Sequence, residues 1–262
     1  MKLLFPACSL AIVTTLMIAA PARADGLSDL KAALARLQAQ TPLKATLDVK
    51  TVERRGEGAE AFEKLGQASV GLEDGARGLQ VLYARDMLAR MESESRQLVH
   101  DTKAKTPTVW ALAKLDSSEV VPMASAAPAL ARSVDESVFK SEKADTWGGK
   151  PARLLTFRVP MSKLSEQQRK YVKEFDGTLA VWIAADGTPL ASEARAAVKG
   201  RAFIVVSFEA VDETSNTYGV VGDRLLTLRN ENHVSSSGAG EHGDERVVRT
   251  LQPQGEPLAA AR

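Results

Sequence analysis

The sequence predicts an α+β fold: a large curved antiparallel sheet, an open half-barrel, with helices on its concave side. Stretches in which apolar and polar residues alternate, as in strands with one solvated face, dominate the second half of the chain. Turn signals such as Asp-Gly separate these stretches, which favours an antiparallel meander. A block of helical periodicity from about Asp86 to Ser133 interrupts the strands, and we expect it to cover one face of the sheet.

The first 24 of the 262 residues have the three parts of a secretory signal peptide. Lys2 supplies the positive charge, an apolar stretch follows, and Ala22-Arg23-Ala24 is an Ala-x-Ala cleavage site. We expect cleavage there, which leaves a single domain over 25–252 and a frayed tail over 253–262. Cys8, the one cysteine, leaves with the signal, so a domain without disulfides in a bacterial periplasm is predicted. An uncleaved signal that anchors the chain is the alternative.

The domain is expected to begin with a helix and continue into strands. Apolar residues from Leu27 to Leu37 share one stripe of a helix, which the Thr41-Pro42 pair ends. The stretch Leu43–Val49 alternates as a strand does. Two further stretches, Gln67–Glu73 and Leu79–Tyr83, flank an Asp-Gly pair and predict a hairpin.

The middle of the chain is predicted to be helical. Helical spacing extends over Asp86–Asp101, and Thr106-Pro107 begins another helix. The stretch Val120–Ala131 is rich in alanine and broken by Pro122 and Pro128, so it is too interrupted for one straight helix. It is also too apolar for a solvated loop. We expect it to lie on an apolar surface, either as a lid over a hollow or as part of a filled core.

Strands are expected again from Val138, with a turn at Trp147-Gly148-Gly149 and a Ser165/Gln168 capping box for a short helix. The clearest strand patterns come last. The predicted strands are Gly177–Ala184, Leu190–Lys199, Ala202–Val211, Asp223–Val234 and Arg246–Leu251, and a turn is predicted at Gly200, between the second and the third.

Two of these stretches, Leu179–Ile183 and Phe203–Val206, are apolar at every position, as in strands that are covered on both sides. We expect one cover to be packed core and the other a hollow closed by the middle helices. The residues predicted to line this ligand-binding hollow are Trp110, Leu112, Val121, Met123, Leu130, Trp182, Phe203 and Phe208.

Composition and motifs exclude several function classes. The chain has 34 basic and 33 acidic residues, so it lacks the positive field that a nucleic-acid backbone requires. Gly238–Gly243 matches G-x-G-x-x-G, but a charged loop and a strand follow it, so a flexible hairpin loop is predicted and no nucleotide cofactor. The three histidines lie in unrelated segments and predict no metal site.

Catalysis is not predicted either. Ser235–Ser237 beside His233 has the residue types of a nucleophile and a base, but we expect the serines to lie in a flexible loop without a rigid elbow. No stretch after the signal reaches the roughly 18 apolar residues of a membrane-spanning helix.

The layout of helix, strands, middle helices and late meander resembles the outer-membrane lipoprotein carrier superfamily, the LolA, LolB and RseB-like fold. The resemblance lies in Leu30–Thr51, Gln67–Tyr83 and Thr178–Phe208. It implies an open curved sheet capped by helices, with an apolar cavity for acyl chains. Without a lipidated cysteine, the chain resembles the soluble carrier more than the anchored acceptor. The buried arginine that gates the carrier's lid cannot be assigned in this sequence.

The predicted function is that of a soluble, non-enzymatic periplasmic protein that binds or carries an apolar ligand, a lipid or the acyl chains of a lipoprotein. The alternative is a periplasmic protein-interaction or regulatory module without a ligand cavity. Expected partners are therefore lipids or lipoproteins, another envelope protein, and the membrane in transient contact. No cofactor, metal or nucleic acid is predicted.

Overall fold

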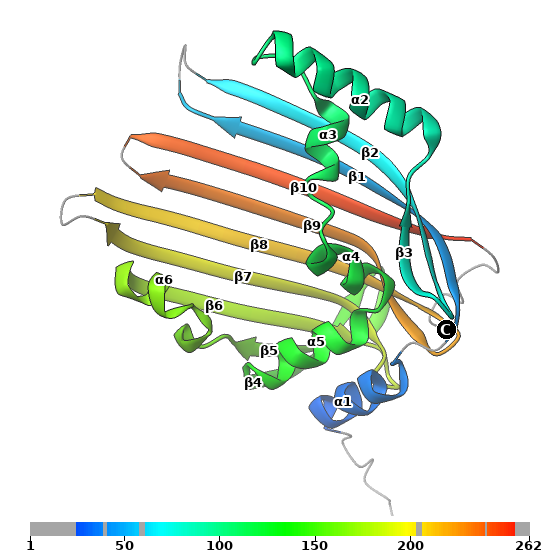
Figure 1. Ribbon diagram of the computed structural model, residues 1–262. Helices are drawn as coiled ribbons and strands as arrows, with labels where there is room; N and C mark the ends of the chain where they lie inside the picture. The colour runs from blue at the N-terminus through cyan, green and yellow to red at the C-terminus, as the bar shows by residue number, and fades with distance from the viewer. Residues whose placement is uncertain (1–24, 39–40, 58–60, 203–205, 239, 255–262) are drawn as a thin grey trace, which may run out of the picture.

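The computed structural model describes residues 25–38, 41–57, 61–202, 206–238 and 240–254. Ten strands in this part of the chain form one antiparallel sheet, and six α-helices accompany it (Figure 1). The sheet order is β3-β2-β1-β10-β9-β8-β7-β6-β5-β4, so the sheet is open, with β3 and β4 at its edges. The predicted α+β fold with one large open antiparallel sheet is confirmed.

Hairpins join most of the neighbouring strands; the exceptions are the pair β5 and β6, joined by the helical segment 159–171, and the pairing of the first strand with the last. The strands are β1 (Leu43–Arg55), β2 (Phe62–Gly75), β3 (Gly78–Leu82), β4 (Val138–Trp147), β5 (Lys150–Arg158), β6 (Val172–Ile183), β7 (Pro189–Ala202), β8 (Val206–Val221), β9 (Arg224–Gly238) and β10 (Glu241–Pro253). β1 and β10 pair from Ala45 opposite Pro253 to Arg55 opposite Gly243. This pairing joins the N-terminal strands and the C-terminal meander into one sheet.

The helices between β3 and β4 lie on one face of the sheet, as predicted (Figure 1). α3 packs on β2 and β1, and both α4 and α5 pack on β9. The helical elements are α1 (Gly26–Arg36), α2 (Arg85–His100), α3 (Pro107–Leu112), α4 (Ser117–Ala124), α5 (Ala126–Asp135), the 3-10 turn η2 (Met161–Lys163) and α6 (Glu166–Tyr171). The predicted Ser165/Gln168 capping box is present at α6.

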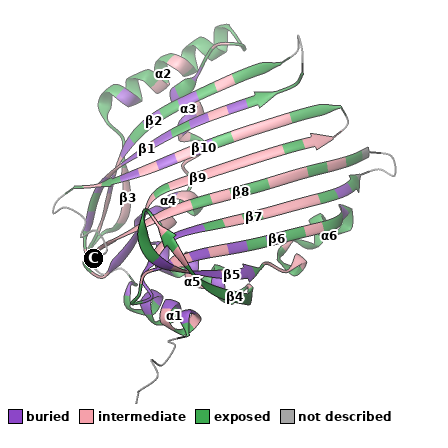
Figure 2. Ribbon diagram, turned by 180° about the vertical axis from the view of Figure 1, so that it is seen from behind, coloured by how far each residue is buried: buried purple, intermediate pink, exposed green. Residues whose placement is uncertain are grey.

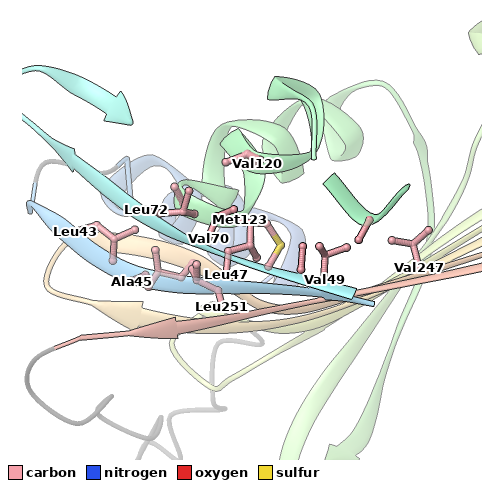
Figure 3. Packing of buried hydrophobic residues seen from close by; sticks show 14 of the residues in the cluster. Leu43, Ala45, Leu47, Val49, Val70, Leu72, Val120, Met123, Val247 and Leu251 are labelled. Atoms are coloured by element: carbon pink, nitrogen blue, oxygen red, sulfur yellow. The ribbon is translucent and has the colours of Figure 1, made fainter. Parts of the chain in front are cut away.

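The proline-broken stretch forms two helices that separate at Ser125, with Pro122 inside α4 and Pro128 inside α5. Both helices bury apolar side chains against the sheet. Val120 and Met123 of α4 belong to a core cluster with β1, β2 and β10, and Figure 3 shows Met123 beside Leu47 and Val49. A second cluster combines α1 and α5 with β5 and β6. Of the two alternatives for this stretch, lid or core, the structure therefore shows core.

Some strand boundaries differ from the prediction. Gly200 lies inside β7 and pairs with Phe208 of β8, so the predicted turn at this position is wrong. A Cβ at position 200 would lie 2.3 Å from the Phe208 ring. Glycine is therefore required here because the ring packs against the backbone, and not because the strand turns. β8 continues to Val221, beyond the predicted end at Val211. The stretch 203–205, which the sequence predicts to be strand, is outside the described residues.

The last strands are longer than predicted as well. Ser235–Ser237, expected in a flexible loop, are strand residues of β9. β10 includes Pro253, where the tail is predicted to begin, and the amide of Gln254 donates to the carbonyl of Lys44 at 2.7 Å. The predicted signal peptide and residues 255–262 lie outside the described part of the chain.

Gly66 of β2 lets α3 approach the sheet, because a Cβ there would lie 2.6 Å from Thr51 Cγ2 and 3.0 Å from backbone atoms of Pro107 and Ala111. We expect Gly66→Ala to lower the free energy of unfolding by about 1–3 kcal/mol, as overpacked cores do. Urea titration measures this loss. Gly75→Ala is the control, since a Cβ at Gly75 would meet nothing within 4 Å; equal losses in both variants would contradict the close approach.

Candidate functional site

The structure places the predicted ligand-binding residues at separate positions. Met123 and Leu130 are 2% and 5% exposed and belong to different core clusters. Leu112 is partly buried against the first cluster, and Val121 points outward with 48% of its surface exposed. These four residues therefore fill the interior or face solvent, and they do not line a common hollow.

The aromatic residues are spread further. Trp182 is the next residue after Val181, which is buried on the helix side, so its side chain lies on the opposite face of the sheet. There the centroids of the Trp182 and Trp147 rings are 5.0 Å apart. Trp110 lies on the helix side, beneath the ammonium groups of Lys64 and Lys114 at 3.7 and 4.4 Å.

Phe208 lines a hollow at the end of the strands, and Phe203 is outside the described residues. That the eight residues bind a ligand stays a prediction, but the described ones do not meet at one place.

The hollow at Phe208 has a volume of about 940 Å³ and lies at the strand ends around the β9–β10 turn, beyond α3, α4 and α5, while α6 lies at the neighbouring ends of β6 and β7 (Figure 1). Its lining includes Glu53, Glu245 and Val234, which are direct cross-strand partners on β1, β10 and β9. Cross-strand partners share one face of a sheet, and Glu53 alternates in phase with Val49 of the helix-covered core. The hollow therefore continues the helix-covered face.

The hollow has an apolar patch on its floor, and polar residues such as Ser236, the cross-strand partner of Ala210, lie beside it. Phe208 and Ala210 of β8 and Val234 of β9 are all half-buried on this face, and Phe62 at the start of β2 is 51% exposed. On the neighbouring strand β7, apolar residues lie at the cross-strand positions of the same sheet face, such as Val198 opposite Ala210. Phe208, Ala210 and Val234 therefore belong to a partly solvated apolar surface next to the core.

Charged side chains form the rim, and most of them are paired within the protein. Glu53, only 5% exposed, forms an ion pair with Arg55. Glu245 pairs with Lys114 at 2.5 Å, and Glu57 Oε1 lies 2.8 Å from His242 Nδ1. These rim charges are already satisfied by partners within the protein. The half-exposed apolar side chains of the floor are therefore the part of the hollow that a ligand could still cover.

A second, smaller hollow of about 390 Å³ lies at the same strand ends, toward the opposite face of the sheet (Figure 2 views the molecule from this side). Ser235, Ser237 and Asp244 line it. The nearby imidazole of His233 has its Nε2 at 2.6 Å from Asp244 Oδ2. The described residues contain no group of three or more His, Cys, Asp or Glu residues that would hold a metal ion.

A continuous chain of polar side chains crosses four strands between the helices and the larger hollow. Tyr218 and Ser192 hydroxyls are 2.7 Å apart, and Asn216 donates to Ser192 at 3.2 Å. Asn230 donates to Asn216 at 2.9 Å, and Arg249 donates to Asn230 at 2.8 Å. These residues come from β7, β8, β9 and β10, so this row of hydrogen-bonded side chains links four neighbouring strands in the middle of the sheet.

Arg249 connects this polar chain to the helical layer. It is 4% exposed, and its Nε and Nη2 donate to the carbonyl of Lys114, just after α3, at 3.2 and 2.9 Å. Its Nη1 forms an ion pair with Glu119 of α4 at 2.9 Å. Burial lowers the pKa of the Arg249 guanidinium, and Glu119 opposes this shift.

Sequence reasoning did not single out Arg249, although a signal for it exists. Arg249 alternates in phase with Val247 and Leu251, both buried, so it is a charge at an inward-facing strand position. Arg224 has a similar role: its Nη1 donates to the carbonyl of Ala124, the last residue of α4, at 3.1 Å and pairs with Asp74 at 2.7 Å.

The sequence matches no known protein family, and no curated protein sequence matches it. Among solved structures, a match was found to a DUF1329 family protein from Desulfovibrio piger, at 8% identity and a TM-score of 0.29. That match covers 87% of this chain and 92% of the other. In the described part of the chain, every helix is too short or too polar to cross a membrane.

Arg249→Ala should lower the free energy of unfolding by about 2–3 kcal/mol, because it removes the donor to the Lys114 carbonyl and to Asn230 and the ion-pair partner of Glu119. Chemical denaturation measures the loss. Arg246→Ala on the same strand is the control: its side chain is 61% exposed and pairs with Glu231, so about 1 kcal/mol or less is expected. Similar effects of the two substitutions would contradict the anchoring role of Arg249.

Burial raises the pKa of Tyr218 to about 12, so this phenol stays protonated in the folded state when an unfolded tyrosine ionises near pH 10. The unfolded state then binds fewer protons between these values, so the free energy of unfolding falls as pH rises. We expect wild type to lose about 2 kcal/mol of stability relative to Tyr218→Phe between pH 10 and pH 12, since the phenol is half-ionised at pH 10 in the unfolded state and at pH 12 in the folded state. Denaturant titration at several pH values measures this, and a constant difference between the two proteins across the range would contradict it.

Proposed function

We propose that this protein is a non-enzymatic binding or carrier protein for an apolar ligand, such as an acyl chain of a lipid or lipoprotein. The larger hollow is the proposed site, in place of the space beneath α3 to α5. The observation that supports the proposal is the apolar patch on its floor: Phe208, Ala210 and Val234 stay half-exposed on the face where the helices bury every comparable residue of β1.

The size and chemistry of the hollow fit a single chain of methylene groups. Ligand sites commonly enclose about 300–1,000 Å³, and the hollow has about 940 Å³. Each methylene buried on such a floor contributes about 0.8 kcal/mol, so no catalytic group is needed for useful affinity. The paired charges on the rim, such as Glu53 with Arg55, leave a polar border for the head of an amphiphile.

Export to the periplasm through a cleaved signal peptide is part of the proposal. It is motivated by Lys2, the apolar stretch after it and the Ala-x-Ala sequence that ends at Ala24. N-terminal sequencing of the protein recovered from a bacterial envelope fraction should begin at Asp25. A protein that keeps its first residues would support the membrane-anchored alternative.

Ala210→Asp should weaken the binding of a fluorescent fatty acid by tenfold or more, because it places a carboxylate in the apolar patch. Val211→Asp is the matched control, since Val211 is the next residue of β8 and points to the opposite face. Fluorescence titration of the three proteins gives the dissociation constants. Wild type that binds no fatty acid and purifies without lipid by mass spectrometry would overturn the proposal.

The second candidate is a protein-interaction or regulatory module. The burial of Met123 and Leu130 favours it, since the space under α4 and α5 is filled by their side chains. A wild-type protein without lipid, together with capture of a defined envelope protein, would favour this function over the carrier.

A further inference from the structure

One edge of the sheet is left without a strand over much of its length. β3 pairs with Gly71–Gly75 of β2, and Phe62–Val70 of the same strand has no strand on its outer side in the described part of the chain. Along these nine of the 14 residues of β2, the outward-facing backbone donors and acceptors have no strand to pair with. Such an edge is a template for another extended strand.

The opposite edge of the sheet carries two features against edge-to-edge pairing that the open stretch of β2 lacks. β4 has a bulge between Phe139 and Ser141, at Lys140, and it carries further charges at Glu142, Lys143 and Asp145. Bulges and charged side chains are the usual means of preventing edge-to-edge pairing.

The open stretch of β2 has an unbroken register with β1 and contains no proline. Its two charged residues are already engaged: Glu63 pairs with Arg54 at 2.7 Å, and the Lys64 ammonium lies 3.7 Å over the Trp110 ring. Leu65, 56% exposed, is an apolar side chain in water. The edge is thus flat, apolar in part and without charges that face outward unpaired.

We propose that this edge of β2 docks the same edge of a second copy of the chain, in antiparallel pairing centred on Gly66. Gly66 is the middle residue of the open stretch Phe62–Val70, so this register pairs all nine residues of both copies. In this register Leu65 faces Gln67 of the second copy and Lys64 faces its Ala68. No residue faces a like charge in this register, so charge repulsion does not oppose the pairing of two copies.

The apolar residues around the edge fit the same partner. Pairing places Phe62 opposite Val70 of the second copy, next to the end of that copy's β3, where Leu82 and Tyr83 are 44% and 45% exposed. α2 lies beside this edge in Figures 1 and 2, and its Leu88 is 48% exposed. Docking would therefore cover side chains that a lone chain leaves in water.

The resulting dimer has one continuous sheet across a two-fold axis. Phe62 both lines the larger hollow and ends the paired stretch, so each hollow borders the seam. The dimer does not depend on the proposed ligand, and the two proposals fail separately.

The test measures the mass of the purified protein by sedimentation velocity over a range of concentrations. Wild type should sediment with twice the mass of one chain. The double variant Leu65→Glu with Gln67→Glu places carboxylates directly opposite each other on both sides of the axis, and we expect association to weaken roughly tenfold or more. Leu65 and Gln67 are both exposed, so the fold tolerates the change, which circular dichroism verifies.

A charge swap makes the register itself testable. Leu65→Lys with Gln67→Glu sets an ammonium opposite a carboxylate in both pairs and should restore the dimer. Ser141→Glu with Lys143→Glu on the exposed edge of β4 is the matched control and should leave the dimer unchanged.

Any of four results would overturn the proposal. Wild type that stays a single chain at high micromolar concentration would exclude the second copy as the occupant. A dimer that survives Leu65→Glu with Gln67→Glu would place the interface elsewhere. A charge swap that fails to restore association would exclude the register centred on Gly66, and a single chain that instead binds another protein through this edge would identify a different partner.

Discussion

The pairing of β1 with β10 is the constraint on which the rest of the structure depends. It joins strands from the two ends of the chain over Ala45–Arg55 and makes one sheet from two otherwise separate sets of hairpins. The helices follow β3 and precede β4, at the two edges of that sheet, so they must cross its face to connect them. The apolar side chains of β1 then meet α3 and α4, and the core forms where they cross.

The helical layer combines apolar packing with a small number of buried polar contacts. Met123 fills the core, while Arg249 and Arg224 donate to the backbone carbonyls of Lys114 and Ala124 at the ends of helices. α3 is therefore held both by its close packing on Gly66 of β2 and by the Arg249 contact just after its last turn. Beyond α3, α4 and α5, the apolar patch at Phe208 stays half-exposed.

Alternating hydropathy predicted the fold class and the central part of most strands, because one buried face and one solvated face leave a period of two in the sequence. It failed where inward positions are polar. The second half of β8 was missed because Thr214 and Asn216 face inward and bond to other side chains, so alternation disappears there. The site was only partly predicted: Phe208 lines the hollow, but which face each aromatic residue takes depends on strand register, which a single sequence does not define.

The neighbour of β1 in the sheet is nearly the last segment of the chain to be made. A growing chain can complete the hairpins of β1, β2 and β3, but β1 keeps one open side until Pro253 has emerged. Contacts of such sequence separation form slowly, since the intervening loop must close first. The complete ten-stranded sheet therefore forms only after the last strand has been made, and until then β1 presents an open edge of its own.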